Sequence, residues 1–334
     1  MKNRKLLAYC QILVLLSLLI LSTTAFEVNA ITEKPVIVCT TSAIGSIVEQ
    51  LVGDTTDVLV LVHPGLCPAD FDLKPGYVDA VSKAQILFKQ NIQGEFWLED
   101  LLAAAGQPDL IVVAISGIYN TPEGAKNYIK GVAGNLSEIM GVDLDLKVSQ
   151  MLSEVDEVSK FMESQAGVLD APNVNVICMS WLQTFIESVG FNVVATYNPP
   201  ETLSAGDINN LLETAKSENV ELVVDNLQID TDFGASIANQ AGAEHVVLTN
   251  FPGAIPNTET LAEMLQYNSE QLFNGTILWR STSTLRTERT DLQNQLTVFQ
   301  IIASLAIIVA LAEAVLLYSK KQTVTAKNEQ QRVL

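Results

Sequence analysis

The chain has 334 residues, of which 48% are hydrophobic and 17% charged, and its 19 basic against 38 acidic side chains give a formal charge of −19. This length allows about two domains with their own cores, and so apolar a chain is not expected to be disordered. An acidic body without a basic cluster repels phosphate, so nucleic-acid binding is excluded. Only two histidines are present, which excludes any site built from three of them.

The N-terminus has the pattern of a secretory signal peptide. Basic residues (Lys2, Arg4 and Lys5) precede an apolar stretch over 6–21, and small residues follow up to Ala30. A basic start, a short apolar run and a small-residue exit are typical of a cleaved signal. We predict a signal peptide over 1–30, and the alternative is a signal anchor that is not cleaved.

Eight short β-rich runs fall into two series, and helix-length segments separate the runs within each series. The runs cover residues 36–39, 57–62, 86–89 and 110–115, then 174–178, 193–196, 221–225 and 245–249. Strands that alternate with helices predict parallel sheets built from βαβ units. Between the two series, 121–165 has helical spacing throughout, which predicts one long helix with Gly141 as a candidate kink.

A second apolar segment, residues 298–318, is long enough to cross a hydrocarbon layer of about 30 Å. Lys320 and Lys321 follow it directly, which favours a C-terminus on the inner side. Glu313 within it either reaches the headgroups or marks a contact with another helix. We therefore predict a single-pass protein of the cell membrane, with the large domain extracellular and a short cytoplasmic tail.

The expected fold class is α/β, with two doubly wound lobes joined by a long rigid helix and followed by a transmembrane helix. The predicted parts are the signal peptide 1–30, N-terminal lobe 31–120, connecting helix 121–170, C-terminal lobe 171–278, stalk 279–297, transmembrane helix 298–318 and cytoplasmic tail 319–334. Ligands bind outside the carboxyl ends of the strands in open α/β sheets. A cleft between two such lobes is therefore the place to look for a site.

Neither lobe has a glycine-rich phosphate loop, which argues against nucleotide binding. No G-x-S-x-G pattern occurs, and His63 and His245 alone offer few ways to build a catalytic triad. We therefore do not expect an enzyme.

The segment over 61–106 resembles the zinc/manganese solute-binding family of ABC transporters. That family shows a P-G-x-D-P-H-x-Y-E-P-x-P motif and then a G-x-E-x-W-L helix. The corresponding positions here are Pro64, Gly65, Pro68, Phe71, Pro75, Gly94, Phe96, Trp97 and Leu98, and a weaker similarity extends over about 35–273. The resemblance implies two α/β lobes joined by one rigid helix, a metal held in the cleft, and delivery to a membrane permease powered by a cytoplasmic ATPase.

The metal ligands of that family are not retained. Three histidines and one carboxylate hold its metal, and this chain has Ala69 where the first histidine belongs. The second falls near Gly117, the third near Met179 and the carboxylate near Asn250. Neither His63 nor His245 aligns with a missing ligand, and we expect His245 to be structural.

Sulfur and carboxylate donors offer one replacement for the lost ligands. Three cysteines outside the signal peptide lie at or near predicted strand ends, and thiolates suit zinc or Cu(I). The hypothetical mixed metal site comprises Cys39, Cys67, Asp70, Asp72, Cys178 and Met179. Alternatively, these cysteines are buried core residues or form a disulfide.

Another hypothesis is an organic ligand or a metal chelate, held by aromatic and polar side chains of the cleft. Such a ligand needs no coordinating residues from the protein. The candidates are Phe71, Trp181, Asp225 and Asn250. An acidic loop that follows a strand can also be a solvated surface, which is the alternative for Asp225.

Two functions remain open. The first, implied by the resemblance, is a membrane-anchored extracellular substrate-binding subunit of an ABC importer. Its ligand would be a transition metal ion (zinc, copper or manganese) or a metal-containing small molecule, and its partners an ABC permease and a cytoplasmic ATPase. The alternative is a cell-surface interaction or adhesion protein that keeps the fold without transport.

Overall fold

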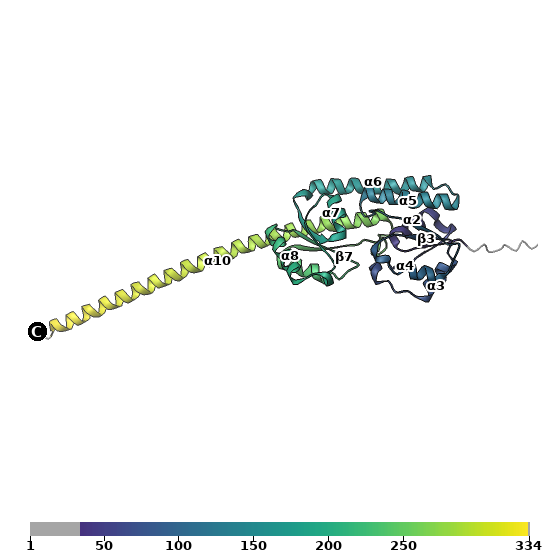
Figure 1. The fold of residues 1–334 in the computed structure, drawn as a ribbon. Helices are drawn as coiled ribbons and strands as arrows, with labels where there is room; N and C mark the ends of the chain where they lie inside the picture. The colour runs from purple at the N-terminus through teal and green to yellow at the C-terminus, as the bar shows by residue number, and fades with distance from the viewer. Residues whose placement is uncertain (1–33, 333–334) are drawn as a thin grey trace, which may run out of the picture.

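The computed structural model describes residues 34–332, so the predicted signal peptide lies outside the described residues. Two four-stranded parallel sheets, with strand orders β2-β1-β3-β4 and β6-β5-β7-β8, form two lobes that lie side by side (Figure 1). All six strand pairings are parallel, in agreement with the βαβ pattern of the sequence. The predicted α/β architecture of two doubly wound lobes is confirmed.

The first lobe has apolar layers on both faces of its sheet. On β1, Ile37 and Cys39 face one core, while Val38 faces the other together with Trp97. A strand buried on both faces reads as a continuous apolar run, which is the pattern of this segment. The elements are β1 (Val36–Cys39), α2 (Ser42–Val52), β2 (Asp57–Val60), α3 (Pro75–Lys83), β3 (Ile86–Lys89), α4 (Leu98–Ala105) and β4 (Ile111–Ala114).

The second lobe repeats this arrangement, and its strands begin and end within two residues of the predicted runs. Its inner strand β7 is buried at all five positions, whereas the edge strand β6 is largely half-buried. The elements are β5 (Asn175–Met179), α7 (Gln183–Val189), β6 (Asn192–Tyr197), α8 (Ala205–Ser217), β7 (Leu222–Asn226), α9 (Asp232–Ala241) and β8 (Glu244–Leu248).

The connection between the lobes is a helical hairpin, so the prediction of one kinked helix is wrong. Helix α5 (Pro122–Met140) ends at Gly141, which has a left-handed backbone (φ +66°), and α6 (Asp145–Val168) runs back beside α5 (Figure 1). A left-handed glycine ends a helix instead of bending it. Helix α5 packs against α2 of the first lobe, and α6 packs against α5 and against α7 of the second, so α6 links the two lobes.

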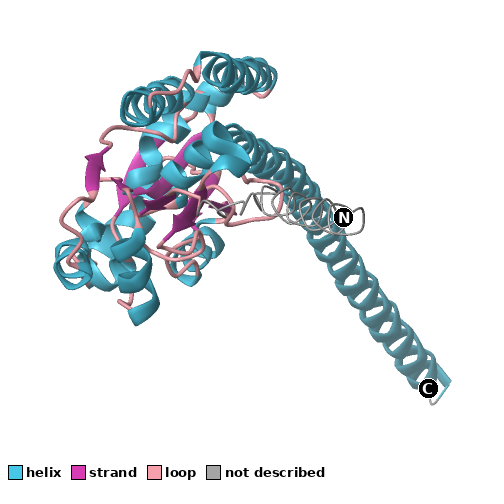
Figure 2. Cartoon of the chain, turned by 90° about the vertical axis from the view of Figure 1, so that its right-hand side faces the viewer, coloured by secondary structure: helices cyan, strands magenta, loops and turns pink. Residues whose placement is uncertain are grey.

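A single helix, α10 (Leu261–Arg332), begins in the core of the second lobe and continues far beyond it (Figures 1 and 2). Met264, Leu265 and Leu272 are buried in the body. Two hydrogen bonds fix the helix where it leaves: Trp279 Nε1 to the Gly242 carbonyl (3.0 Å) and Arg280 Nη1 to the Leu169 carbonyl (2.9 Å). The part over 291–318 is apolar and long enough to be a candidate membrane span.

Candidate functional site

The two sheets meet at the carboxyl ends of their strands, and the chain itself bridges them there. Gln228, after β7, donates from Nε2 to the Pro64 carbonyl at 2.8 Å. Ser42, after β1, donates from its hydroxyl to the Pro252 carbonyl at 2.7 Å. These bonds join residues 164 and 210 positions apart. The two lobes are therefore in direct contact at the edge where a ligand cleft was predicted.

On the first lobe, this edge is built from hydroxyl, amide and carboxylate groups. The Thr41 hydroxyl donates to Gln90 Oε1 at 2.5 Å, and the Thr40 hydroxyl donates to Glu95. The other Glu95 oxygen accepts the backbone N–H of Asn91 at 2.7 Å. Glu95 is buried and fully engaged, so it holds the loop after β3 in place. Glu95 was not among the predicted site residues, although it lies close to Trp97 and Leu98 of the G-x-E-x-W-L motif, which could have drawn attention to it.

On the second lobe, the edge is a layer of buried amides and one hydroxyl. Thr249 exchanges two hydrogen bonds with the Asn268 side chain, through its N–H (3.0 Å) and its carbonyl (2.7 Å). Gln228 Nε2 also donates to the Thr249 hydroxyl at 2.9 Å, and Gln228 Oε1 accepts the N–H of Asn250 at 3.2 Å. Sequence reasoning missed Gln228, because a glutamine in a loop carries no motif.

Two buried polar atoms at this edge have no protein partner. They are Asn226 Nδ2, at the end of β7, and Asn250 Oδ1, just after β8. The Asn226 residue is almost fully buried, and its other side-chain atom, Oδ1, accepts the N–H of Gln228 at 3.2 Å. An unpaired buried donor or acceptor costs about 1–3 kcal/mol. The edge therefore has one donor and one acceptor available to a ligand or to water.

The predicted mixed metal site is not assembled. Within the part of the chain that the structure describes, no three His, Cys, Asp or Glu side chains lie close enough to hold one metal ion. Cys39, Cys178 and Met179 are all completely buried, and Cys67 is half-buried before a short turn. The three cysteines are free, so a disulfide is also not formed.

Burial also raises the pKa of both thiols. Burial, with a smaller effect from Glu187, raises the pKa of Cys178 to about 12. Burial and then Glu49 raise the pKa of Cys39 even further. Both side chains are completely buried within the larger apolar core, so these two residues are the small core hydrophobes that the alternative hypothesis described.

The remaining residues of the proposed first-lobe site belong to a loop with its own packing. Asp70 and Asp72 are exposed. Phe71, between them, packs on Trp97 with ring centroids 4.0 Å apart and on Tyr77 at 5.0 Å. Its ring therefore belongs to the smaller core of the first lobe, although the sequence placed it in the cleft.

Asp225 does not face the cleft or the solvent, contrary to both predictions for it. Its carboxylate is completely buried, accepts the Tyr197 hydroxyl and lies 2.7 Å from Nε2 of His245. A Cβ on Gly234 of α9 would be only 2.1 Å from this carboxylate, so the group lies directly under that helix. His245 accordingly has the structural role expected of it.

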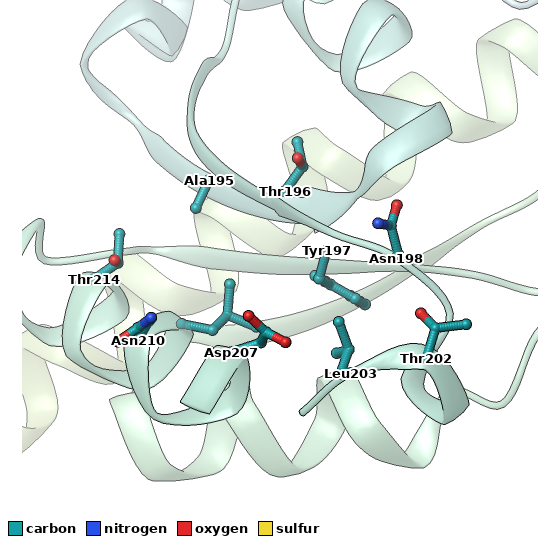
Figure 3. Close-up of a pocket in the computed structure, with 10 residues that line it drawn as sticks. Ala195, Thr196, Tyr197, Asn198, Thr202, Leu203, Asp207, Asn210 and Thr214 are labelled. Carbon is teal, nitrogen blue, oxygen red and sulfur yellow. The ribbon is translucent and has the colours of Figure 1, made fainter. Parts of the chain in front are cut away.

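Of the four cleft candidates, Trp181 and Asn250 are the two whose positions suit a ligand. Trp181 is 37% exposed, and its carbonyl accepts a hydrogen bond from Asn120 of the segment before α5 at 3.4 Å. Asn250 carries the unpartnered oxygen. A separate hollow of about 380 Å³ lies between β6 and α8 (Figure 3). It contains none of the predicted site residues.

Comparisons with known proteins agree with the fold. The family model described as "Zinc-uptake complex component A periplasmic" matches residues 37–275. A manganese-binding lipoprotein of Halalkalibacterium halodurans is 21% identical over 262 residues, which cover 72% of this chain and 87% of that protein.

Solved structures share the fold at low sequence identity. A manganese-bound periplasmic metal-binding protein from Candidatus Liberibacter asiaticus has a TM-score of 0.63 and 12% identity, covering 73% of this chain and 100% of that one. A zinc-bound deletion mutant of ZnuA has a TM-score of 0.61 and 19% identity, covering 73% and 98%. At these identities, the likeness establishes the architecture alone.

Proposed function

Because this chain belongs to the zinc-uptake component A family of solute-binding proteins, we propose that it is the substrate-binding subunit of an ABC importer, held at the outer face of the membrane by α10. Its partners in this proposal are a permease and a cytoplasmic ATPase. Membership of a family of binding proteins agrees with the prediction that the chain is not an enzyme.

The course of α10 supports the proposed anchor. The helix runs without interruption from the lobe core to a segment with a mean hydropathy of 2.5, which no part of the body covers. Such a segment spans a bilayer with its apolar side chains facing lipid. Tethering keeps the body near a permease in the same membrane, so a modest affinity for the ligand is sufficient.

The cargo we propose is a metal-containing small molecule, bound by hydrogen bonds. The observation that carries this choice is the pair of unpartnered atoms, Asn226 Nδ2 and Asn250 Oδ1. Among residues 34–332, no three His, Cys, Asp or Glu side chains come together to hold a bare ion. A donor and an acceptor amide suit the polar periphery of a chelate, whereas a bare zinc or manganese ion needs several charged or imidazole ligands.

Thermal unfolding of the full chain in detergent tests the cargo. A ligand that binds only the folded state raises stability by about 2.7 kcal/mol at one hundred times its Kd. Iron chelates and cobalamin-like compounds are compared with Zn²⁺, Mn²⁺ and Cu⁺. We expect a chelate to raise the midpoint, and Asn250→Ala to reduce that rise while Asn210→Ala, in α8, leaves it unchanged. A rise with a bare ion that Cys67→Ser abolishes would instead support the thiol site.

A cell-surface interaction protein remains the second candidate. The direct hydrogen bonds between the lobes favour it, because they join the two lobes without a ligand. Co-purification from the native membrane separates the two functions: a bound permease and ATPase support transport, and their absence together with a silent ligand screen supports the surface role.

A further inference from the structure

The contact between the lobes contains a hydrogen bond from Gln228 that the proposed cargo does not explain. We propose that Gln228 is a latch that holds the lobes closed without any metal, taking the place of the ion that bridges the lobes in metal-binding relatives. This inference concerns the empty protein, so it goes beyond the proposed transport function and does not depend on it.

The Gln228 carboxamide is almost fully buried, and its hydrogen-bonding groups reach both lobes. One bond from Nε2 crosses to the Pro64 carbonyl, and the others remain within the second lobe, with Thr249 and Asn250. The backbone N–H of Gln228 is fixed by Asn226 Oδ1. The side chain is thus held in position by its own lobe and offers one N–H to the opposite lobe.

Proline supplies the carbonyl acceptor of both main cross-lobe bonds. Pro64 accepts from Gln228, and Pro252 accepts from Ser42, in opposite directions across the contact. The ring of proline fixes φ near −65°, which restricts the motion of each loop. A Cβ on Gly253 would lie 3.7 Å from Pro64 Cγ, so the two loops also lie against each other. Neutral groups therefore form this contact, and it needs no counterion.

The positions that would otherwise carry metal ligands agree with this assignment. Ala69 and Gly117 have no coordinating atom, Met179 is buried, and Asn250 uses its N–H to hold the latch. A metal that binds residues from both lobes supplies the free energy of closure in a clamp of this kind. Here hydrogen bonds between neutral groups supply it.

The distance between the lobes in the empty protein is the test. Spin labels are placed at Lys74→Cys, before α3, and Glu213→Cys, in α8, in a Cys67→Ser background of the full chain in detergent. Both positions are exposed, and α3 and α8 lie on the side of the body away from α5 and α6 (Figure 1). The buried Cys39 and Cys178 remain unlabelled.

We expect one narrow distance distribution in EDTA. Zn²⁺ and Mn²⁺ are added to the chain that retains Cys67, and there they should leave the hydrogen-exchange rate of the loop over 249–254 unchanged. Loss of one ordinary hydrogen bond lowers the ratio of closed to open molecules by about fivefold, so Gln228→Ala adds longer distances and Gln228→Ala with Ser42→Ala adds more. The control is Gln240→Ala, because its exposed amide bonds only to Ser236 of its own helix.

Hydrogen exchange provides a second readout, because its rate follows the open population even when that population is small. The loop over 249–254 should exchange about fivefold faster in Gln228→Ala and at the unchanged rate in Gln240→Ala. If Gln228→Ala fails to fold, Ser42→Ala gives the same comparison. A metal-free protein that is open and closes on addition of Zn²⁺ or Mn²⁺ overturns the proposal, as do unchanged distances and exchange rates in the double variant.

Discussion

Replacing Gly234 by alanine tests whether Asp225 belongs to the interior of the second lobe. The new Cβ would lie 2.1, 2.5 and 2.6 Å from the Asp225 carboxyl atoms, well inside van der Waals contact. The carboxylate must then move away from Tyr197 and His245. Overpacking costs about 1–3 kcal/mol and a disturbed buried hydrogen bond about 1–3 kcal/mol, while alanine regains about 1 kcal/mol of helix propensity.

The net expectation for Gly234→Ala is a loss of about 3 kcal/mol in the free energy of unfolding. At roughly 2–4 °C per kcal/mol for a body of this size, the melting temperature falls by roughly 6–12 °C. Circular dichroism of the full chain in detergent measures it.

A matched control is Gly134→Ala in α5, because no atom lies within 4 Å of its added Cβ. This variant should be neutral or slightly stabilised. In an Asp225→Ala background, the cost of Gly234→Ala should largely disappear, since the clashing group is gone. If Gly234→Ala and Gly134→Ala have the same melting temperature, Asp225 is not packed under α9 and could again face a ligand.

Three further expectations concern the thiols, a helix cap and acid stability. Of the three cysteines that the structure describes, only Cys67 should react with a maleimide in the native state. The buried Cys178, whose pKa is raised to about 12, should stay unlabelled at pH 9. Mass spectrometry of labelled peptides decides, and a labelled Cys178 contradicts its burial. Thr121→Ala removes the cap of α5 and should cost about 1 kcal/mol in urea unfolding; no loss would mean that the hairpin does not need it. Hydrogen bonds from Ser204 lower the pKa of Asp207, so their stabilisation is present above the ordinary carboxyl pKa and is lost as the pH falls through the lowered one. The melting curves of wild type and Ser204→Ala should therefore converge in acid, and a constant difference refutes this.

The strands were predictable because their signal is local. The run over 86–89 matches β3 at both ends, since a strand buried on both faces needs a continuous apolar stretch. The reversal of the chain after α5 could not be predicted in the same way, because Gly141 is compatible with a kink and with a left-handed cap. Only the packing of α6 back along α5 selects the cap.

The site was harder to predict because it depends on partners distant in the sequence. Cys39 is the last residue of β1 and Cys178 the last but one of β5, close to where a metal ligand in this fold would lie, yet both side chains point into the core. Asp225 follows the same rule and lies beneath α9 because of Gly234, nine residues later. The role of Gln228 requires Pro64, 164 residues away, which no spacing rule relates to it.

The unbroken course of α10 also determines which part of the molecule can move. The first part of the helix is buried in the second lobe, and in our proposal a later part crosses the bilayer. This lobe and the anchor therefore move as one rigid body. The part of α10 over 281–297 rises about 25 Å at 1.5 Å per residue, and in our proposal this length sets the height of the lobe above the lipid. Any opening is then a rotation of the first lobe relative to the second lobe and the anchor. A tilt of the membrane helix would move the second lobe, and with it the edge where the two lobes meet.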